Sequence, residues 1–157
     1  MTTHDDASLT PRHWIALTAL ISGLVALYLH LWKLGLTGPL VCTSNRGCEI
    51  AQMSSFGWFL GVDVALIGTV GYTLILTTAL IGIQPRWIDD ARITKVLMAL
   101  IFPAILFTLR LKYGEFVVLR TFCPWCAISA ITITTHGVLV MLDRKRLARP
   151  RRAAPPP

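Results

Sequence analysis

Two long stretches without a charged side chain place the strongest limit on the fold. Residues 14–32 and 64–83 contain no Asp, Glu, Lys or Arg, and each is close to the roughly 20 residues that cross a bilayer core. A third charge-free run covers residues 122–142. The run at 96–109 is shorter, contains Pro103, and reaches full length only when Ile93 and a snorkelling Lys95 are included. The sequence therefore predicts an all-α integral membrane protein, a bundle of four transmembrane helices.

The charge distribution predicts the orientation of this bundle. The last segment, residues 143–157, is rich in Pro and holds six Lys and Arg against one acid, so we expect a disordered cytoplasmic tail after a membrane domain at residues 1–142. An even number of helices then places both termini in the cytoplasm and the active site on the outer side of the cell inner (cytoplasmic) membrane. The net charge of +7 indicates contact with the lipid bilayer rather than nucleic acid, because much of it lies in this tail.

The four cysteines all fall on the predicted outer side. Cys42 and Cys48 lie in the loop between the first two spans, and Cys123 and Cys126 form a Cys-x-x-Cys at the start of the fourth. Disulfides are stable outside the cytoplasm. Three interpretations remain open at this point: static structural disulfides, a four-cysteine zinc site, and a redox relay.

Three details favour the relay. Cys123 precedes a helix N-terminus, where free N–H groups and the helix dipole stabilise a thiolate, and Arg120 could add to that effect. Pro124 is suited to the first turn of a helix. Cys126 should lie one turn deeper, by about 4.5 Å, within reach of an apolar molecule. The loop at residues 33–62 is also longer than a connection requires, as functional loops often are.

With these features the chain resembles the vitamin K epoxide reductase (VKOR) family over about residues 13–142. The segment GCEIAQMSSFGWFLGVDVALIG follows the loop cysteines as in bacterial members. The order of the two pairs differs from the DsbB type, in which Cys-x-x-Cys comes first. No thioredoxin-like domain follows the fourth span here, so we expect a bacterial homologue without that fused domain and with a separate partner protein.

The resemblance implies a membrane disulfide-generating oxidoreductase, a quinone-dependent enzyme of the VKOR type. Electrons would pass from a secreted or periplasmic thioredoxin-like (DsbA-type) protein to Cys42, from Cys48 to Cys123, and from Cys126 to a quinone of the menaquinone, ubiquinone or vitamin K type. Ser54, or Ser55 if the register shifts by one residue, would lie near the quinone on a short half-helix in the long extracytoplasmic loop. No metal is implied.

Aromatic side chains on the outer halves of the spans are further candidates for the quinone pocket, each equally suited to packing or to the membrane interface. They are Phe56, Trp58, Phe59, Phe122 and Trp125. His30 and His136 are candidates for proton transfer or for hydrogen bonds between helices.

Two departures from the family pattern bear on function. Asp63 replaces a proline that many relatives carry before the second span, and we expect it to cap that helix. Ala130 stands where animal enzymes carry a tyrosine, which does not favour epoxide reduction. Two alternatives stay open: a non-catalytic membrane protein with static disulfides, and a quinone or epoxide reductase that works in the reducing direction.

Overall fold

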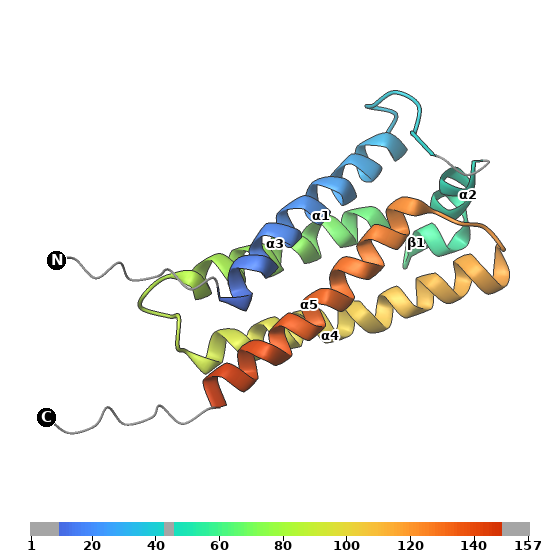
Figure 1. Cartoon of the computed structure of the whole chain (residues 1–157). Helices are drawn as coiled ribbons and strands as arrows, with labels where there is room; N and C mark the ends of the chain where they lie inside the picture. The colour runs from blue at the N-terminus through green and yellow to red at the C-terminus, as the bar shows by residue number, and fades with distance from the viewer. Residues whose placement is uncertain (1–9, 43–45, 149–157) are drawn as a thin grey trace, which may run out of the picture.

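Four long helices form the body of the protein (Figure 1). The computed structural model describes residues 10–42 and 46–148. Its long helices, each long and apolar enough to cross a membrane, are α1 (Pro11–Lys33), α3 (Val64–Ile83), α4 (Ala91–Tyr113) and α5 (Pro124–Ala148). The prediction of a four-helix membrane bundle is confirmed.

The third span is longer than its charge-free run. The helix α4 begins five residues before residue 96 and continues through a π-helical segment, η2 (Gly114–Val118). Pro103 lies inside α4, where neighbouring helices make a missing N–H tolerable. The span therefore includes charged residues at both ends, which is why charge-free length alone underestimates it.

A compact segment connects α1 to α3 and is called the outer segment here, after the side of the membrane on which the sequence predicts it. It contains α2 (Gly47–Met53), the 3-10 turn η1 (Ser55–Gly57), and a two-stranded hairpin of β1 (Trp58–Phe59) and β2 (Val62–Asp63). Leu60 and Gly61 turn the hairpin with positive φ angles of 52° and 80°, the conformation that tight hairpins require. The helix α2 is the expected short half-helix.

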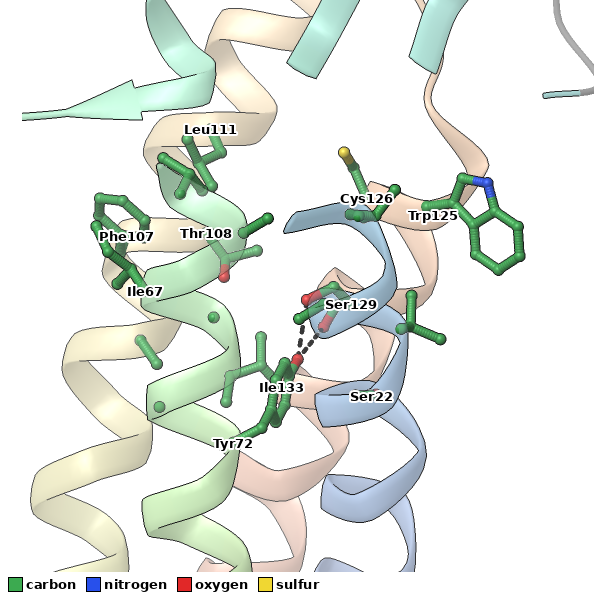
Figure 2. Close-up of a pocket in the computed structure, with 18 of the residues that line it drawn as sticks. Ser22, Ile67, Tyr72, Phe107, Thr108, Leu111, Trp125, Cys126, Ser129 and Ile133 are labelled. Atoms are coloured by element: carbon green, nitrogen blue, oxygen red, sulfur yellow. Dashed lines mark hydrogen bonds between the residues drawn. The ribbon is translucent and has the colours of Figure 1, made fainter. Parts of the chain in front are cut away.

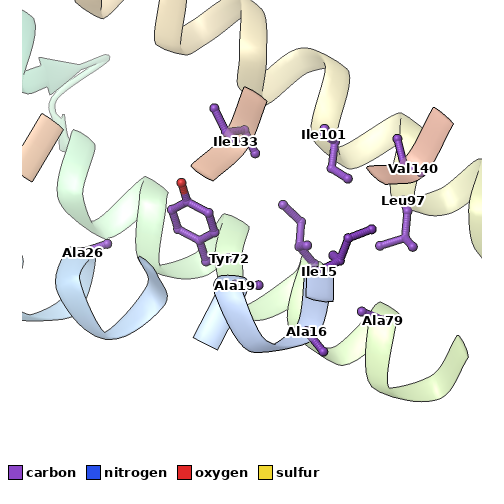
Figure 3. Close-up of a cluster of buried hydrophobic side chains, with 11 residues drawn as sticks. Ile15, Ala16, Ala19, Ala26, Tyr72, Ala79, Leu97, Ile101, Ile133 and Val140 are labelled. Carbon is purple, nitrogen blue, oxygen red and sulfur yellow. The ribbon is translucent and has the colours of Figure 1, made fainter. Parts of the chain in front are cut away.

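The bundle core is built on small side chains (Figure 3). Ala16, Ala19 and Ala26 of α1 are buried, as is Ala79 of α3. Lipid is as apolar as the core, so close backbone approach rather than hydrophobic transfer holds membrane helices together. Larger residues from the other helices complete this core: Leu97, Ile101, Ile133 and Val140.

At the end of the bundle remote from the cysteines, a single buried arginine joins every long helix. All five N–H groups of Arg12 donate hydrogen bonds of 2.8 to 3.0 Å. The acceptors are the carbonyls of Gly82, Trp87 and Asp90, the Thr94 hydroxyl, and the Asp143 carboxylate. A guanidinium carries five donors, so this cation is completely satisfied without water.

The same network alters the predicted end of the membrane domain. Asp143 is fully buried against Arg12, and α5 continues to Ala148. Residues 143–148, the first part of the expected tail, are therefore helical and belong to the bundle. Residues 149–157 lie outside the described residues.

Replacing Arg12 should loosen the whole bundle. Arg12→Gln leaves the buried Asp143 carboxylate with Arg146, 3.4 Å away, as its remaining cation, and loss of one partner of a buried ion pair typically costs about 3–5 kcal/mol. Arg92→Gln is the matched control, because Arg92 is exposed near the same end of the bundle. Denaturant unfolding in detergent should show a large loss for Arg12→Gln and little change for the control; equal stability of the two variants would contradict the role given to Arg12.

Candidate active site

The two cysteine pairs meet at the end of the bundle opposite Arg12. Cys48 and Cys123 are both fully buried in one apolar cluster, and Cys42 and Cys126 pack against it. Cys42 and Cys48 form a disulfide with a Cα–Cα distance of 6.0 Å, whereas Cys123 and Cys126 are free thiols. The long loop thus reaches the fourth span, as the relay interpretation requires.

Specific contacts hold the outer segment against α5. The Trp125 indole N–H donates to the Val41 carbonyl at 2.9 Å. The Gln52 amide of α2 lies 3.5 Å from the Cys126 sulfur. Gly57 permits the tight turn after α2, because a Cβ there would lie 2.0 Å from the Gln52 carbonyl oxygen. The start of α5 consequently lies beside α2 (Figure 1).

The helix α5 begins at Pro124, directly after Cys123, as the sequence predicts. The Cys123 carbonyl accepts the first helical hydrogen bond, from Ala127 at 3.0 Å. The Cys123 N–H donates to the Glu115 carboxylate at 2.6 Å, and Glu115 also pairs with Lys112 at 2.6 Å. An acid that is 4% exposed therefore anchors the backbone of the first thiol.

The pKa of Cys123 is lowered by this environment. The largest cause is a hydrogen bond from the Cys126 thiol; burial raises the pKa, and the Cys126 backbone N–H, 3.3 Å from the Cys123 sulfur, lowers it. Glu115 raises the pKa and Lys112 lowers it. This direction agrees with the expectation from the sequence, although its largest cause is the Cys126 thiol and the contributing cation is Lys112 instead of Arg120, which is exposed.

A cavity of about 450 Å³ opens between the helices beneath these sulfurs (Figure 2). Cys126 lines it, and its walls are mostly apolar. Polar side chains also line it, from the outer segment and from all four long helices: Gln52, Ser22, Tyr72, Thr108, Lys112, Glu115 and Ser129. An apolar cavity with a few converging polar groups is typical of a small-molecule site.

The residues predicted for the quinone pocket fall into two groups. Phe56 and Trp125 line the cavity, whereas Trp58, Phe59 and Phe122 do not. Ser54 follows α2 directly, and its hydroxyl donates to the Ala51 carbonyl at 2.8 Å. Ser54 is not among the cavity-lining residues, so its expected contact with quinone stays a prediction without support from the cavity.

Sequence reasoning missed Gln52, Glu115 and Lys112. Gln52 follows Cys48 by four residues on α2, which places both on one face of the helix, so this spacing could have found it. Glu115 gave no such signal. It lies eight residues before Cys123, and the π-helical segment and the chain reversal that bring the two together have no obvious signature in the sequence. Single-turn π segments are frequent at functional sites.

Asp63 joins the outer segment to the bundle. Its carboxylate caps α3 by accepting from the Ala65 N–H at 3.0 Å, which confirms the predicted cap. It also binds Lys33 and His30 of α1. Burial raises the pKa of Asp63, but hydrogen bonds from Lys33, His30 and Ala65 together lower it below its ordinary value of 3.8. The stabilisation that these contacts of the Asp63 carboxylate provide is therefore fully present above pH 3.8. It is lost only as the pH falls through the lowered pKa of Asp63.

Neither histidine candidate lines the cavity. His30 is bound to Asp63 at 2.7 Å, and His136 lies 2.7 Å from the Thr18 hydroxyl of α1. Within residues 10–42 and 46–148, no group of three or more His, Cys, Asp or Glu side chains is arranged to hold a metal ion.

A four-helix membrane protein with two adjoining cysteine pairs above an apolar cavity has the architecture of a membrane thiol oxidoreductase. Residues 13–141 match the model of the Vitamin K epoxide reductase family. This match covers most of the chain, and the protein belongs to that family. Membership implies a multi-pass membrane oxidoreductase that joins thiol–disulfide chemistry to quinones.

Opposite charges beside Cys123 should shift its titration in opposite directions. Glu115→Gln keeps an oxygen acceptor for the Cys123 N–H but removes the negative charge, so the pKa of Cys123 should fall. Lys112→Met should raise it, because the Glu115 charge then faces the thiolate without its partner. The pH dependence of Cys123 alkylation by iodoacetamide, followed by peptide mass spectrometry, measures both shifts.

Glu49→Gln is the matched control for this test, because Glu49 is paired with Arg46 at the surface of the outer segment and should leave the titration unchanged. Shifts of the same sign in Glu115→Gln and Lys112→Met would refute this electrostatic account.

Proposed function

We propose that this protein generates disulfides by passing electrons from a secreted or periplasmic thioredoxin-like protein to a membrane quinone. One observation carries the proposal: the two cysteine pairs share one buried cluster, and Cys126 of the inner pair lines an apolar cavity that opens between the membrane helices. The alternative, a non-catalytic protein with two structural disulfides, does not explain why the cysteines beside this cavity are free thiols.

The exposure of the outer disulfide supports attack by the partner at Cys42. Cys48 is fully buried, whereas Cys42 is partly exposed, and the neighbouring Val41 side chain is 70% exposed. A protein thiolate that approaches from solvent therefore reaches the Cys42 sulfur, and Cys48 is the leaving thiol. Released inside the cluster, Cys48 is already close to α5.

The relay proceeds in three exchanges in which electrons and protons balance. First, the partner's two thiols become a disulfide, and Cys42 and Cys48 become thiols. Next, Cys48 attacks Cys123 of an oxidised Cys123–Cys126 pair, and Cys42 then attacks Cys48, which restores the outer disulfide and leaves two inner thiols. These thiols finally form their disulfide again and give two electrons and two protons to the quinone.

The cavity residues fit a quinone. A quinone supplies a two-electron acceptor whose apolar body dissolves in the bilayer. Apolar walls would hold that body, and Gln52 beside Cys126 would donate a hydrogen bond to an oxygen of the ring. The lowered pKa of Cys123 favours its thiolate form, the nucleophile that would close the inner disulfide.

We also propose the orientation that this function needs, with the cysteine end outside the cytoplasm and Arg12 at the inner face of the cell inner membrane. The basic last turn of α5, with Lys145 and Arg146, supports this orientation through the tendency of cytoplasmic segments to carry positive charge.

The proposed relay predicts different defects for substitution of the inner cysteine Cys126 and of the outer cysteine Cys42. Reduced Cys126→Ala should fail to reduce quinone even in a single turnover, because it cannot form the inner disulfide. Reduced Cys42→Ala should still complete one turnover from Cys123 and Cys126, yet fail to sustain catalysis with a thioredoxin-like dithiol. Stopped-flow absorbance of quinone reduction by the purified proteins measures both, and full activity of Cys126→Ala would exclude the assignment.

A further inference from the structure

Tyr72 and Ser129 form a polar pair in the cavity wall, beside the Ser22 hydroxyl and within the membrane-spanning part of the bundle. The Tyr72 hydroxyl of α3 lies 2.9 Å from the Ser129 hydroxyl of α5 and 3.1 Å from the Ser129 carbonyl (Figure 2). Both residues line the cavity. A polar side chain inside a membrane span calls for a functional explanation.

Ser129 differs from the other hydroxyl residues of its helix. Thr134 and Thr135 are exposed and Thr132 is half-buried, and each donates to the carbonyl four residues earlier in α5. Such bonds satisfy a hydroxyl in lipid without any partner from another helix. Ser129 instead hydrogen-bonds with Tyr72 of α3 in the cavity wall, where a ligand in the cavity can also reach its hydroxyl.

The pair has one O–H group to spare. Two hydroxyls carry two protons, and the Ser129 carbonyl accepts one of them from Tyr72. The second proton can lie between the two hydroxyl oxygens, point to the neighbouring Ser22 hydroxyl, or point to an acceptor in the cavity. A ligand oxygen can therefore be bound without leaving any buried donor unsatisfied.

The position of the pair relative to Cys126 indicates which oxygen it would bind. Ser129 follows Cys126 by three residues, about one turn and 4.5 Å along the helix axis, on the same face. Gln52 contacts the Cys126 sulfur from the outer segment. Polar groups thus lie on both sides of the sulfur along the cavity, and the two carbonyl oxygens of a para-quinone lie at opposite ends of its ring.

We propose that Tyr72 and Ser129 form a quinone-binding subsite that donates a hydrogen bond to the ring oxygen pointing into the membrane. This inference rests on the proposed function and specifies how the ring is held beside Cys126. Because reduction increases the negative charge on that oxygen, the donor also favours electron transfer from the thiols.

Removal of either hydroxyl should weaken quinone binding. Tyr72→Phe and Ser129→Ala should each raise the Kd of a short-chain ubiquinone roughly tenfold, the usual effect of one lost hydrogen bond, and the double variant should be little worse than either. Quenching of tryptophan fluorescence measures Kd, since Trp125 lines the cavity. The infrared carbonyl band of the bound quinone should shift to higher frequency in both variants.

Matched controls separate binding from packing. Tyr28→Phe alters a tyrosine that packs on Trp125 outside the cavity lining, and Thr132→Val removes a hydroxyl of α5 that bonds within its own helix; both should keep the wild-type Kd. In all variants, reduction of the Cys42–Cys48 disulfide by dithiothreitol should stay at the wild-type rate, which checks that the outer site is folded.

The outcomes are distinguishable. An unchanged Kd and an unchanged carbonyl band in Tyr72→Phe and Ser129→Ala would overturn the subsite, even if their thermal stability fell, because that pattern describes a bond that only joins α3 to α5. Failure of the wild-type protein to bind and reduce the quinone would overturn the proposed function itself.

Discussion

The lack of hydrogen-bond partners in a bilayer is the constraint on which this structure depends. The apolar segments must satisfy their backbone as helices, and every polar side chain among them must find a protein partner. Arg12 meets this requirement with five acceptors at one end of the bundle. At the other end, Asp63, Lys33 and Glu115 are paired in the same way. Charges are thus confined to the two ends, and the middle is left for an apolar cavity.

This division separates two steps of the proposed chemistry. The outer segment presents a partly exposed sulfur to solvent at Cys42 and buries Cys48 next to α5. The cavity presents Cys126 to the interior of the membrane. Thiol exchange between proteins can therefore take place at the surface while transfer to a lipid-soluble acceptor takes place inside. Cys123 takes part in both steps, and the buried pair of Glu115 and Lys112 positions it. Glu115 accepts a hydrogen bond from the Cys123 backbone, and the two side chains place opposite charges near the Cys123 sulfur.

Hydrophobic patterning predicted the parts of this arrangement that depend on local sequence. Charge-free length identifies the spans, and helix-terminus chemistry places Cys123 and Asp63 correctly. The Arg12 network, which extends α5 past residue 142, and the partnership of Glu115 with Cys123 depend on contacts between segments far apart in the chain. The hydrophobic pattern of the sequence does not predict such contacts. Ser54 was expected near the quinone, but α2 ends one residue earlier and turns its hydroxyl to the backbone, while Gln52 on the facing side of α2 contacts Cys126.

The central claim is that Cys48 and Cys123 are close enough to exchange bonds, and a variant with only these two cysteines tests it most directly. In Cys42→Ala/Cys126→Ala, mild oxidation should give an intramolecular Cys48–Cys123 disulfide, identified by mass spectrometry of non-reduced peptides. Cys48→Ala/Cys126→Ala, which keeps Cys42 and Cys123, is the control and should cross-link far more slowly. If Cys48 and Cys123 stay free, or pair only between molecules, the loop does not deliver its sulfur to α5 and the relay is wrong.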